Sequence, residues 1–269
     1  MVQSYKLFLY LCIVNWEIIH IDETDSTNRW LMDKASKAEA LGFAPQTLRL
    51  QSLNTNISEN IVVWTDYQTA GRGCGTNSWE SERGKNLLFS MLIHPTDISA
   101  NEQFRITEIV SVALCQTVQA YINNKVEIKW PNDIYVGDKK ICGILIENRL
   151  RGNTIKDTII GIGLNVNQTE FKSDAPNPVS IRLLTGIETD LGELLQAFLR
   201  AFEVTYHSKT TCFTYKSMLF RRGKYAFYED KTSCFGATLT DVLPDGRLLL
   251  VDKDGRERLY AFKEVSFII

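Results

Sequence analysis

A glycine-rich connection directly after an apolar strand constrains this chain more than any other stretch. Residues 61–67 (Ile-Val-Val-Trp-Thr-Asp-Tyr) are typical of a strand, and glycines stand at positions 71, 73 and 75 of the following segment, 68–81. Glycine has no side chain to hold the backbone away from a ligand. Successive N–H groups of such a loop form an anion-binding concavity, to which Arg72 adds donors that match phosphate or carboxylate. Trp79 offers an apolar face on which a ring could stack.

The glycine-rich segment alone does not identify a function, because such a connection is about as often an ordinary turn as an anion site. No Gly-Lys-Ser/Thr sequence closes it, so it is not the nucleotide-binding P-loop. Its glycine spacing also differs from the dinucleotide fingerprint, and no helix is indicated at the last glycine. The surrounding chain has to decide between these interpretations.

Composition places the chain among ordinary globular proteins and excludes some partners. The 269 residues, 44% hydrophobic and 23% charged, are enough for one sizeable catalytic domain and a small second domain. A net charge of -2 and the absence of any Lys/Arg-rich run predict no nucleic-acid binding. Six scattered cysteines without a Cys-x-x-Cys pair, and three histidines, argue against a zinc site. We expect reduced thiols and a cytoplasmic location.

The N-terminal segment contains an apolar run at residues 5–14. The run is shorter than a membrane span, carries one lysine and has no small-residue cleavage site after it. We therefore predict neither membrane insertion nor secretion. Residues 1–14 are interpreted as an extra edge strand or an ill-ordered extension and are assigned to no domain.

Alternating strand and helix patterns predict an α+β fold with a mixed central sheet flanked by helices. Strands are expected at 16–21, 61–68, 86–93, 126–130, 134–136, 140–147 and 158–167. Amphipathic helices are expected from Asp25 or Ser26 to about Leu41, and at 102–123, 191–206 and 212–220, with a proline-rich loop at 173–180. Short strands with hairpin turns after residue 222 predict a small C-terminal barrel. The domains are thus 15–222 and 223–269.

Two patterns within the predicted sheet have the character of a binding site. Pro131 ends one strand, and the Gly137-Asp138 turn brings Lys140 back towards Lys129 and Asp133. Two lysines and a carboxylate beside a glycine loop could handle phosphate, although such groups also form ordinary solvated ion pairs. Glycines two apart at 161 and 163 leave one face of a strand bare, for a flat ligand or for a close helix contact.

Five blocks in this order resemble the biotin protein ligases, also called biotin–[acetyl-CoA-carboxylase] ligases. They are Asp-Ser-Thr-Asn at 25–28, the glycine loop, Lys-Trp-Pro-Asn-Asp at 129–133, residues 139–147 and residues 161–167. The resemblance runs from about Ile18 to the C-terminus. It implies a catalytic domain like that of class II aminoacyl-tRNA synthetases and biotin/lipoate ligases, followed by an SH3-like β-barrel.

The resemblance also implies roles for individual residues. The expected catalytic residues are Arg72, Lys140 and Asp133. Biotin would be bound by Ser26, Thr27, Gln68, Gly71, Arg72, Gly73, Lys140, Gly143, Gly161 and Gly163. ATP or the adenylate would be bound by Arg72, Cys74, Trp79, Lys129, Asn132 and Asn165. No side chain is identified as a metal ligand, since Mg²⁺ would arrive with ATP, held mainly by phosphate and water.

The implied reaction activates biotin with ATP as biotinyl-5′-AMP and transfers it to a lysine of a biotin carboxyl carrier protein or domain. Three other functions have to be compared with this one. A lipoate–protein ligase shares the fold and the chemistry, and a non-catalytic biotin-binding regulator would be expected to lack Lys140 or Asp133. A DNA-binding repressor would need an N-terminal helix-turn-helix, for which the residues before Trp16 are too few. Monomer and homodimer are both compatible with the sequence.

The glycine loop departs from the family pattern at one point. The family loop commonly reads Gly-Arg-Gly-Arg-x-Gly-Arg, whereas this chain has Cys74 and Asn77 where further arginines would stand, and Thr76 in place of the last glycine. We hypothesise weaker retention of biotinyl-AMP, because a charge-assisted contact to phosphate is missing. Alternatively, Asn77 or Lys85 takes over that contact.

Overall fold

The computed structural model describes residues 16–40, 60–172 and 177–269. The predicted N-terminal extension at 1–14 and part of the predicted proline-rich loop lie outside these residues. Within the described part of the chain, no helix has the length and apolar character needed to cross a membrane.

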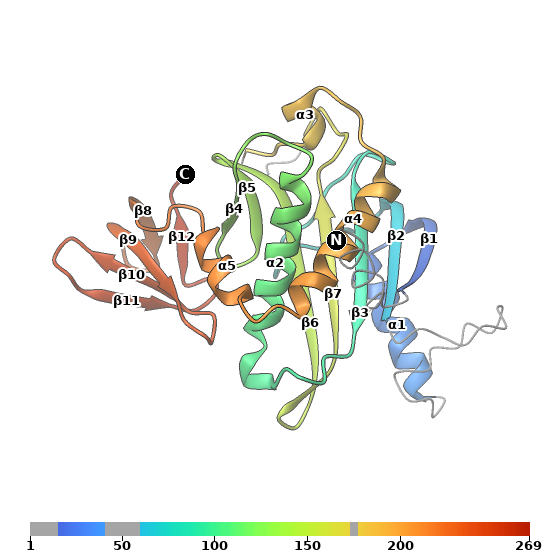
Figure 1. The fold of residues 1–269 in the computed structure, drawn as a ribbon, viewed down its shortest axis with the longest axis horizontal. Coiled ribbons are helices and arrows are strands. Elements are labelled where there is room, and N and C mark those ends of the chain that lie inside the picture. Colours follow the sequence, from blue (N-terminus) through green and yellow to red (C-terminus); the bar gives the residue numbers. More distant parts are fainter. Residues whose placement is uncertain (1–15, 41–59, 173–176) are drawn as a thin grey trace, which may run out of the picture.

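A seven-stranded mixed sheet forms the centre of the larger part of the molecule (Figure 1). Its strand order is β1-β2-β3-β7-β6-β5-β4, in which β1 runs parallel to β2 and all other neighbours are antiparallel. The predicted mixed central sheet is thereby confirmed. The strands are β1 (Trp16–Thr24), β2 (Asn60–Gln68), β3 (Leu87–Ile93), β4 (Val126–Lys129), β5 (Asp133–Val136), β6 (Lys139–Arg151) and β7 (Thr154–Leu164).

Helices cover both faces of this sheet, as its alternating side chains require. Val62 of β2 joins the main core with the buried residues of α2 (Phe104–Gln119) and α4 (Leu191–Tyr206). Its neighbours Ile61 and Val63 point the other way and join a second core with α1 (Thr27–Ala40). All seven residues of β3 are buried, because this strand lies in the middle of the sheet under both helix layers.

The boundaries of the predicted elements agree closely where the pattern is strong. Helix α4 has the bounds that its apolar spacing predicts, and Asp190 caps it by accepting a hydrogen bond from the Glu193 N–H at 2.8 Å. Strand β7 starts earlier and ends earlier than predicted. It pairs with β6 as far as Arg151 opposite Thr154, and the chain leaves the sheet after Leu164.

Three short elements complete the larger part of the molecule. They are a 3₁₀ turn (Ala100–Glu102), α3 (Ile181–Thr185) and α5 (Thr211–Ser217). The sequence did not predict α3, since five residues are too few to show a helical period. Its N-terminus is capped by the Ser180 hydroxyl, which accepts from the Leu183 N–H at 3.2 Å, and Gly186 ends it with φ of +73°.

A second, antiparallel sheet of five strands forms the C-terminal part, in the order β11-β10-β9-β8-β12. Its strands are β8 (Tyr225–Asp230), β9 (Cys234–Val242), β10 (Leu248–Asp252), β11 (Glu257–Tyr260) and β12 (Val265–Phe267). The prediction of a C-terminal β-rich unit is confirmed. The SH3-like assignment and the boundary at residue 222 stay predictions.

The two sheets are joined by specific contacts at the end of the molecule where β4 and α5 lie (Figure 1). The buried Trp130 indole N–H donates to the carbonyl of Gly246 at 2.9 Å, and its ring meets Phe262 edge-on at 6.4 Å. Lys216 of α5 also forms an ion pair with Asp241 of β9 at 2.9 Å. The C-terminal sheet is therefore held against the larger part rather than tethered by the chain alone.

Candidate active site

A cavity of about 960 Å³ opens on the face of the main sheet that carries the start of α1. Its walls come from that helix start, the glycine loop, the β4–β6 hairpin, the bare part of β7 and the C-terminal sheet. All of the predicted site residues except Gly71 line it. They are Ser26, Thr27, Gln68, Arg72, Gly73, Cys74, Trp79, Lys129, Asn132, Asp133, Lys140, Gly143, Gly161, Gly163 and Asn165.

The floor of the cavity is a glycine patch formed by Gly143, Gly161 and Gly163. Gly143 of β6 pairs directly with Gly163 of β7, and Gly161 follows two positions away on the same face. The neighbouring Ile160 and Ile162 face the main core on the other side of the sheet. Removing three side chains from adjacent positions leaves a shallow depression, as the glycine spacing predicts.

The Trp79 indole lies on part of this glycine patch. A Cβ placed on Gly163 would come within 2.6 Å of the indole nitrogen, and one on Gly143 within 3.0 Å of the ring. The indole N–H is buried and has no hydrogen-bond partner in the described part of the chain. An unsatisfied buried donor is costly, so a ligand that offers an acceptor here, or that draws the indole out, gains by it.

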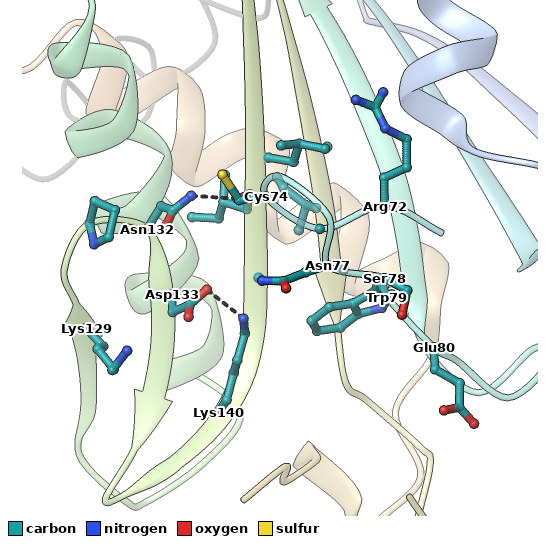
Figure 2. A pocket seen from close by; sticks show the side chains of 18 of the residues that line it. Arg72, Cys74, Asn77, Ser78, Trp79, Glu80, Lys129, Asn132, Asp133 and Lys140 are labelled. Atoms are coloured by element: carbon teal, nitrogen blue, oxygen red, sulfur yellow. Dashed lines mark hydrogen bonds and ion pairs between the residues drawn. The ribbon is translucent and has the colours of Figure 1, made fainter. Parts of the chain in front are cut away.

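The β4–β6 hairpin gathers charge along one wall. Asp133 stands opposite Lys129 in the β4–β5 pairing, and its carboxylate forms an ion pair with the Lys140 ammonium at 2.7 Å. Both partners are about one-quarter exposed, at 25% and 26%. Figure 2 shows Asp133 and Lys140 facing Asn77 and Trp79 of the glycine loop across the cavity. The convergence that the hairpin predicts is therefore present.

Lys129 is the second cation of this wall. Its ammonium lies 5.4 Å from the ring centre of Tyr135 and 5.1 Å from that of Phe267, within cation–π range. Burial lowers the pKa of Lys129 below its ordinary value, and the charges of Lys140 and Arg221 lower it further, against the opposing effect of Asp133. An anion entering the cavity would favour the protonated form of Lys129 and raise its pKa back towards the ordinary value.

A chain of hydrogen bonds positions the start of α1 against the sheet. The Gln68 side-chain oxygen accepts from the Thr27 backbone N–H at 2.9 Å, and the Ser90 hydroxyl donates to the Thr27 hydroxyl oxygen at 2.6 Å. Ser90 also lies 2.5 Å from the side-chain oxygen of Asn28, which packs over Gly161. The helix start and the candidate ligand contacts are thus the same residues, as helix N-termini allow.

Arg72 is held differently from the prediction that it wraps a phosphate. Its guanidinium makes two hydrogen bonds to the Glu147 carboxylate, at 2.9 and 3.3 Å, and Glu147 also accepts from the Asn28 amide at 2.7 Å. In Figure 2 the Arg72 side chain points away from Lys140. The pair is partly exposed, with 39% of the Arg72 side chain accessible, so separating it costs little.

The glycine loop folds back on itself as a narrow hairpin. The Gly73 N–H donates to the Asn77 carbonyl at 2.7 Å and the Trp79 N–H to the Gly71 carbonyl at 2.9 Å. Gly71 does not line the cavity, and its missing side chain instead makes room for the Trp79 carbonyl oxygen. The expectation that Gly71 contacts biotin stays a prediction, and the role that the structure gives this glycine is to let the loop close.

Two predicted adenylate contacts have their side-chain amides occupied by the protein. Asn132 donates to the Ile144 carbonyl at 2.7 Å, and the buried Asn165 donates to the Val179 carbonyl at 3.1 Å. Both line the cavity, so their remaining polar atoms or backbone are what a ligand could use. Lys85, considered as a substitute for the missing loop charge, does not line it.

Sequence reasoning gave no role to several residues that shape the site. Asn28 and Glu147 belong to the blocks 25–28 and 139–147, and this was the one sequence feature that could have pointed to a place in the site. Ser90 sits in an apolar strand, where one hydroxyl gives no signal. The C-terminal sheet also contributes a wall, formed by Phe262, Lys263, Val265, Ser266 and Phe267. Contacts between distant segments leave no local pattern.

One group of potential metal ligands occurs in the described ranges, away from this cavity. The ligand atoms of His20, Asp22 and Asp66 lie within 4.8 Å of one another on β1 and β2. Two of the three residues are exposed, and His20 already bonds Asp66 at 3.0 Å. Inside the cavity the Asp133 carboxylate is paired with Lys140, so the lysine-rich wall suits a metal that arrives already bound to phosphates.

Comparisons with known proteins agree with this geometry. Residues 43–165 match the model of the Biotin/lipoate A/B protein ligase family. The bifunctional ligase/repressor BirA of Bacillus spizizenii is 34% identical over 163 residues, which cover 59% of this chain and 49% of that protein. The biotin–[acetyl-CoA-carboxylase] ligase of Paracoccus denitrificans is 28% identical over 185 residues, which cover 66% of this chain and 68% of that protein. The chain thus spans about half the length of the BirA protein it matches.

Solved structures give the same fold. The biotin protein ligase of Aquifex aeolicus, determined in complex with biotin and ATP, superposes with a TM-score of 0.70. It is 22% identical, and the match covers 93% of this chain and 97% of the other. The chain therefore has the fold of the biotin protein ligases, and the part that matches the Biotin/lipoate A/B protein ligase family model includes the glycine loop and the β4–β6 hairpin.

Proposed function

We propose that this protein activates biotin with ATP as biotinyl-5′-AMP and then transfers biotin to a lysine of a biotin carboxyl carrier domain. One observation carries the proposal. The bare glycine patch, which can accept a flat ring, lies in the same cavity as the Lys140–Asp133 pair, which can handle a phosphate. The matched relatives include a ligase named for the acetyl-CoA carboxylase, which supports a carboxylase subunit as the acceptor.

Biotin would lie on the glycine patch with its ureido ring near the start of α1. Ser26 and Thr27 line the cavity and are buried, so hydrogen bonds to them would form away from water. The Trp79 indole now covers part of the patch and would share it or move aside when biotin binds. Among the residues that the structure describes, the Trp79 indole N–H has no hydrogen-bond partner at present, so a movement that brings it to an acceptor on the ligand would be favourable.

In the first step, an oxygen of the biotin carboxylate attacks the α-phosphorus of ATP, a P–O bond forms, and pyrophosphate leaves. Such a transfer depends on positioning and on positive charge around the phosphoryl oxygens. Lys129 on β4 and Lys140 on β6 both line the cavity, and the two strands are hydrogen-bonded to β5 between them, which fixes both lysines before the substrate arrives. Mg²⁺, supplied with ATP, would neutralise part of the triphosphate charge.

In the second step, the amine of the carrier lysine attacks the carbonyl carbon of the mixed anhydride, an amide forms, and AMP leaves. The attacking amine has to be uncharged. Asp133 is our candidate to orient this lysine and to take its proton. Its present partner is Lys140, so an incoming carrier lysine would compete with a cation that the adenylate phosphate also attracts.

The test is intact-mass analysis of a carrier domain incubated with this protein, ATP, Mg²⁺ and biotin. We expect a biotinyl adduct with the wild-type protein and none with Lys140→Ala. Lys139→Ala is the matched control, since this neighbouring lysine is exposed and does not line the cavity, and it should leave the adduct unchanged.

The same experiment with lipoate separates the neighbouring activity. An adduct with lipoate alone would transfer the proposal to lipoate ligation, which the family model also includes. No adduct with either acid, together with measurable biotin binding, would indicate a non-catalytic binder and would overturn the proposed reaction.

A further inference from the structure

A lysine of the C-terminal sheet reaches the tip of the glycine loop. The ammonium of Lys263 occupies the space beside Gly75, where a Cβ on that glycine would collide with the nitrogen. Both Lys263 and the neighbouring loop residues Cys74 and Thr76 line the cavity. Residues nearly 190 positions apart in sequence thus meet at the cavity rim.

The turn that carries Lys263 is built in a way that a lysine does not favour. The Glu264 N–H donates to the Ala261 carbonyl at 3.1 Å, and the Glu264 carboxylate accepts from the Ala261 N–H at 2.7 Å. Lys263, at the third position of this turn, has φ of +69°, a conformation in which glycine or asparagine is usual. A strained residue of this kind persists where the surrounding structure or the function requires its side chain.

The charge of Lys263 is unmatched. In the part of the chain that the structure describes, its ammonium forms no ion pair, and its ring contact is with Phe262 at 5.8 Å. The loop tip opposite, residues 73–77, contains no charged side chain, and Arg72 at its base is paired with Glu147. An ammonium without a counter-ion that lies against a neutral loop at the rim of the cavity attracts an anion.

We propose that Lys263 binds a phosphate of the nucleotide and of biotinyl-5′-AMP, supplying from the C-terminal sheet the positive charge that the loop lacks at Cys74 and Asn77. This inference rests on the proposed function, since it assigns the phosphate as that of ATP and the adenylate. It replaces the suggestions that Asn77 or Lys85 takes over this contact. The C-terminal sheet then completes the nucleotide site instead of merely flanking it.

The decisive variant is Lys263→Gly, because stability and binding should change in opposite directions. Glycine relieves the positive φ, so the midpoint temperature of unfolding should rise. Loss of the ammonium should weaken ATP binding about tenfold, measured by calorimetry with Mg²⁺ and ATP, as expected for one charge-assisted contact. Biotin affinity measured without ATP should stay within twofold. Lys253→Ala is the matched control, because this exposed lysine lies in the turn between β10 and β11 and does not line the cavity.

A charge returned to the loop should rescue the defect. Cys74→Arg combined with Lys263→Gly should recover most of the lost ATP affinity. Equal ATP affinity in Lys263→Gly and the wild-type protein would overturn the inference, as would an unrescued loss that also appears in Lys253→Ala. Because ATP binding is measured without turnover, a wild-type protein that binds ATP but forms no adenylate would disprove only the proposed reaction. A wild-type protein that binds no ATP would disprove both.

Discussion

The two walls of the cavity are built on different principles. The hairpin wall carries Lys129, Asp133 and Lys140 on paired strands, where backbone hydrogen bonds fix the spacing of the charges. The loop wall, residues 71–79, is closed by few backbone hydrogen bonds, and its tip is neutral. The difference suggests a division of labour, with the chemistry on the rigid wall and ligand retention on the adaptable one.

The largest effect should come from Asp133→Asn on the rigid wall. Transfer of biotin from preformed biotinyl-AMP to the carrier should fall by about 10²- to 10⁴-fold, the usual contribution of a positioned base. Adenylate formation should fall much less, because Lys140 remains. Single-turnover transfer and pyrophosphate exchange measure the two steps. Asp138→Asn, at the turn of the same hairpin, is the control, and equal losses in both steps would contradict the assignment.

A smaller effect is expected where the two walls meet. Gly163→Ala puts a methyl group against the Trp79 indole, so biotin affinity should fall about tenfold to a hundredfold, which corresponds to the usual cost of overpacking. Gly192→Ala in helix α4, where the nearest atom to an added Cβ is 3.3 Å away, should bind biotin normally. Titration calorimetry with biotin checks both variants. Unchanged affinity in Gly163→Ala would show that the glycine patch is not the ring site.

On the loop wall, Cys74→Arg should strengthen retention. The added guanidinium can reach a phosphate, so release of biotinyl-AMP should slow about threefold to tenfold, less than a full charge-assisted contact if Lys263 already supplies one. Stopped-flow displacement of the adenylate measures the rate. Cys74→Ser keeps the loop neutral and should release at the wild-type rate. If Cys74→Arg released biotinyl-AMP as fast as the wild-type protein, the hypothesis that the loop lacks a needed charge would be wrong.

The smallest effect concerns pH and the buried cation of the hairpin wall. The pKa of Lys129 is lower in the folded protein than in the unfolded chain, so the unfolded state binds more protons between these two values. The destabilisation is complete below the lowered pKa and is relieved as pH rises towards the ordinary value of 10.5. Lys129→Met should therefore be more stable than wild type at pH 7, with the difference shrinking at alkaline pH. Thermal unfolding of both proteins against pH measures this, and a difference that grows with pH would be the contrary result.

Much of the fold and most of the site could be predicted from the sequence, for a physical reason. Helix α4 and the bare face at Gly161 and Gly163 follow from local periodicity, which neighbouring residues determine, whereas Gly143 was expected from the family resemblance. The Glu147 partner of Arg72 and the approach of Lys263 to Gly75 depend on chain segments far apart in sequence, which no local pattern records. The Trp79 indole could be expected to face a ring, but its present place on the patch depends on packing.

The hydrogen bond from Trp130 to Gly246 has a consequence for how the molecule comes apart. If the nucleotide touches both sheets, ligand binding stabilises them together, and the two sheets should melt as one cooperative unit when ATP is bound. Without ligand, only the direct contacts between the two sheets hold the C-terminal sheet in place, and we expect it to separate from the larger part first. Nucleotide would then act as a clamp that converts two melting events into one.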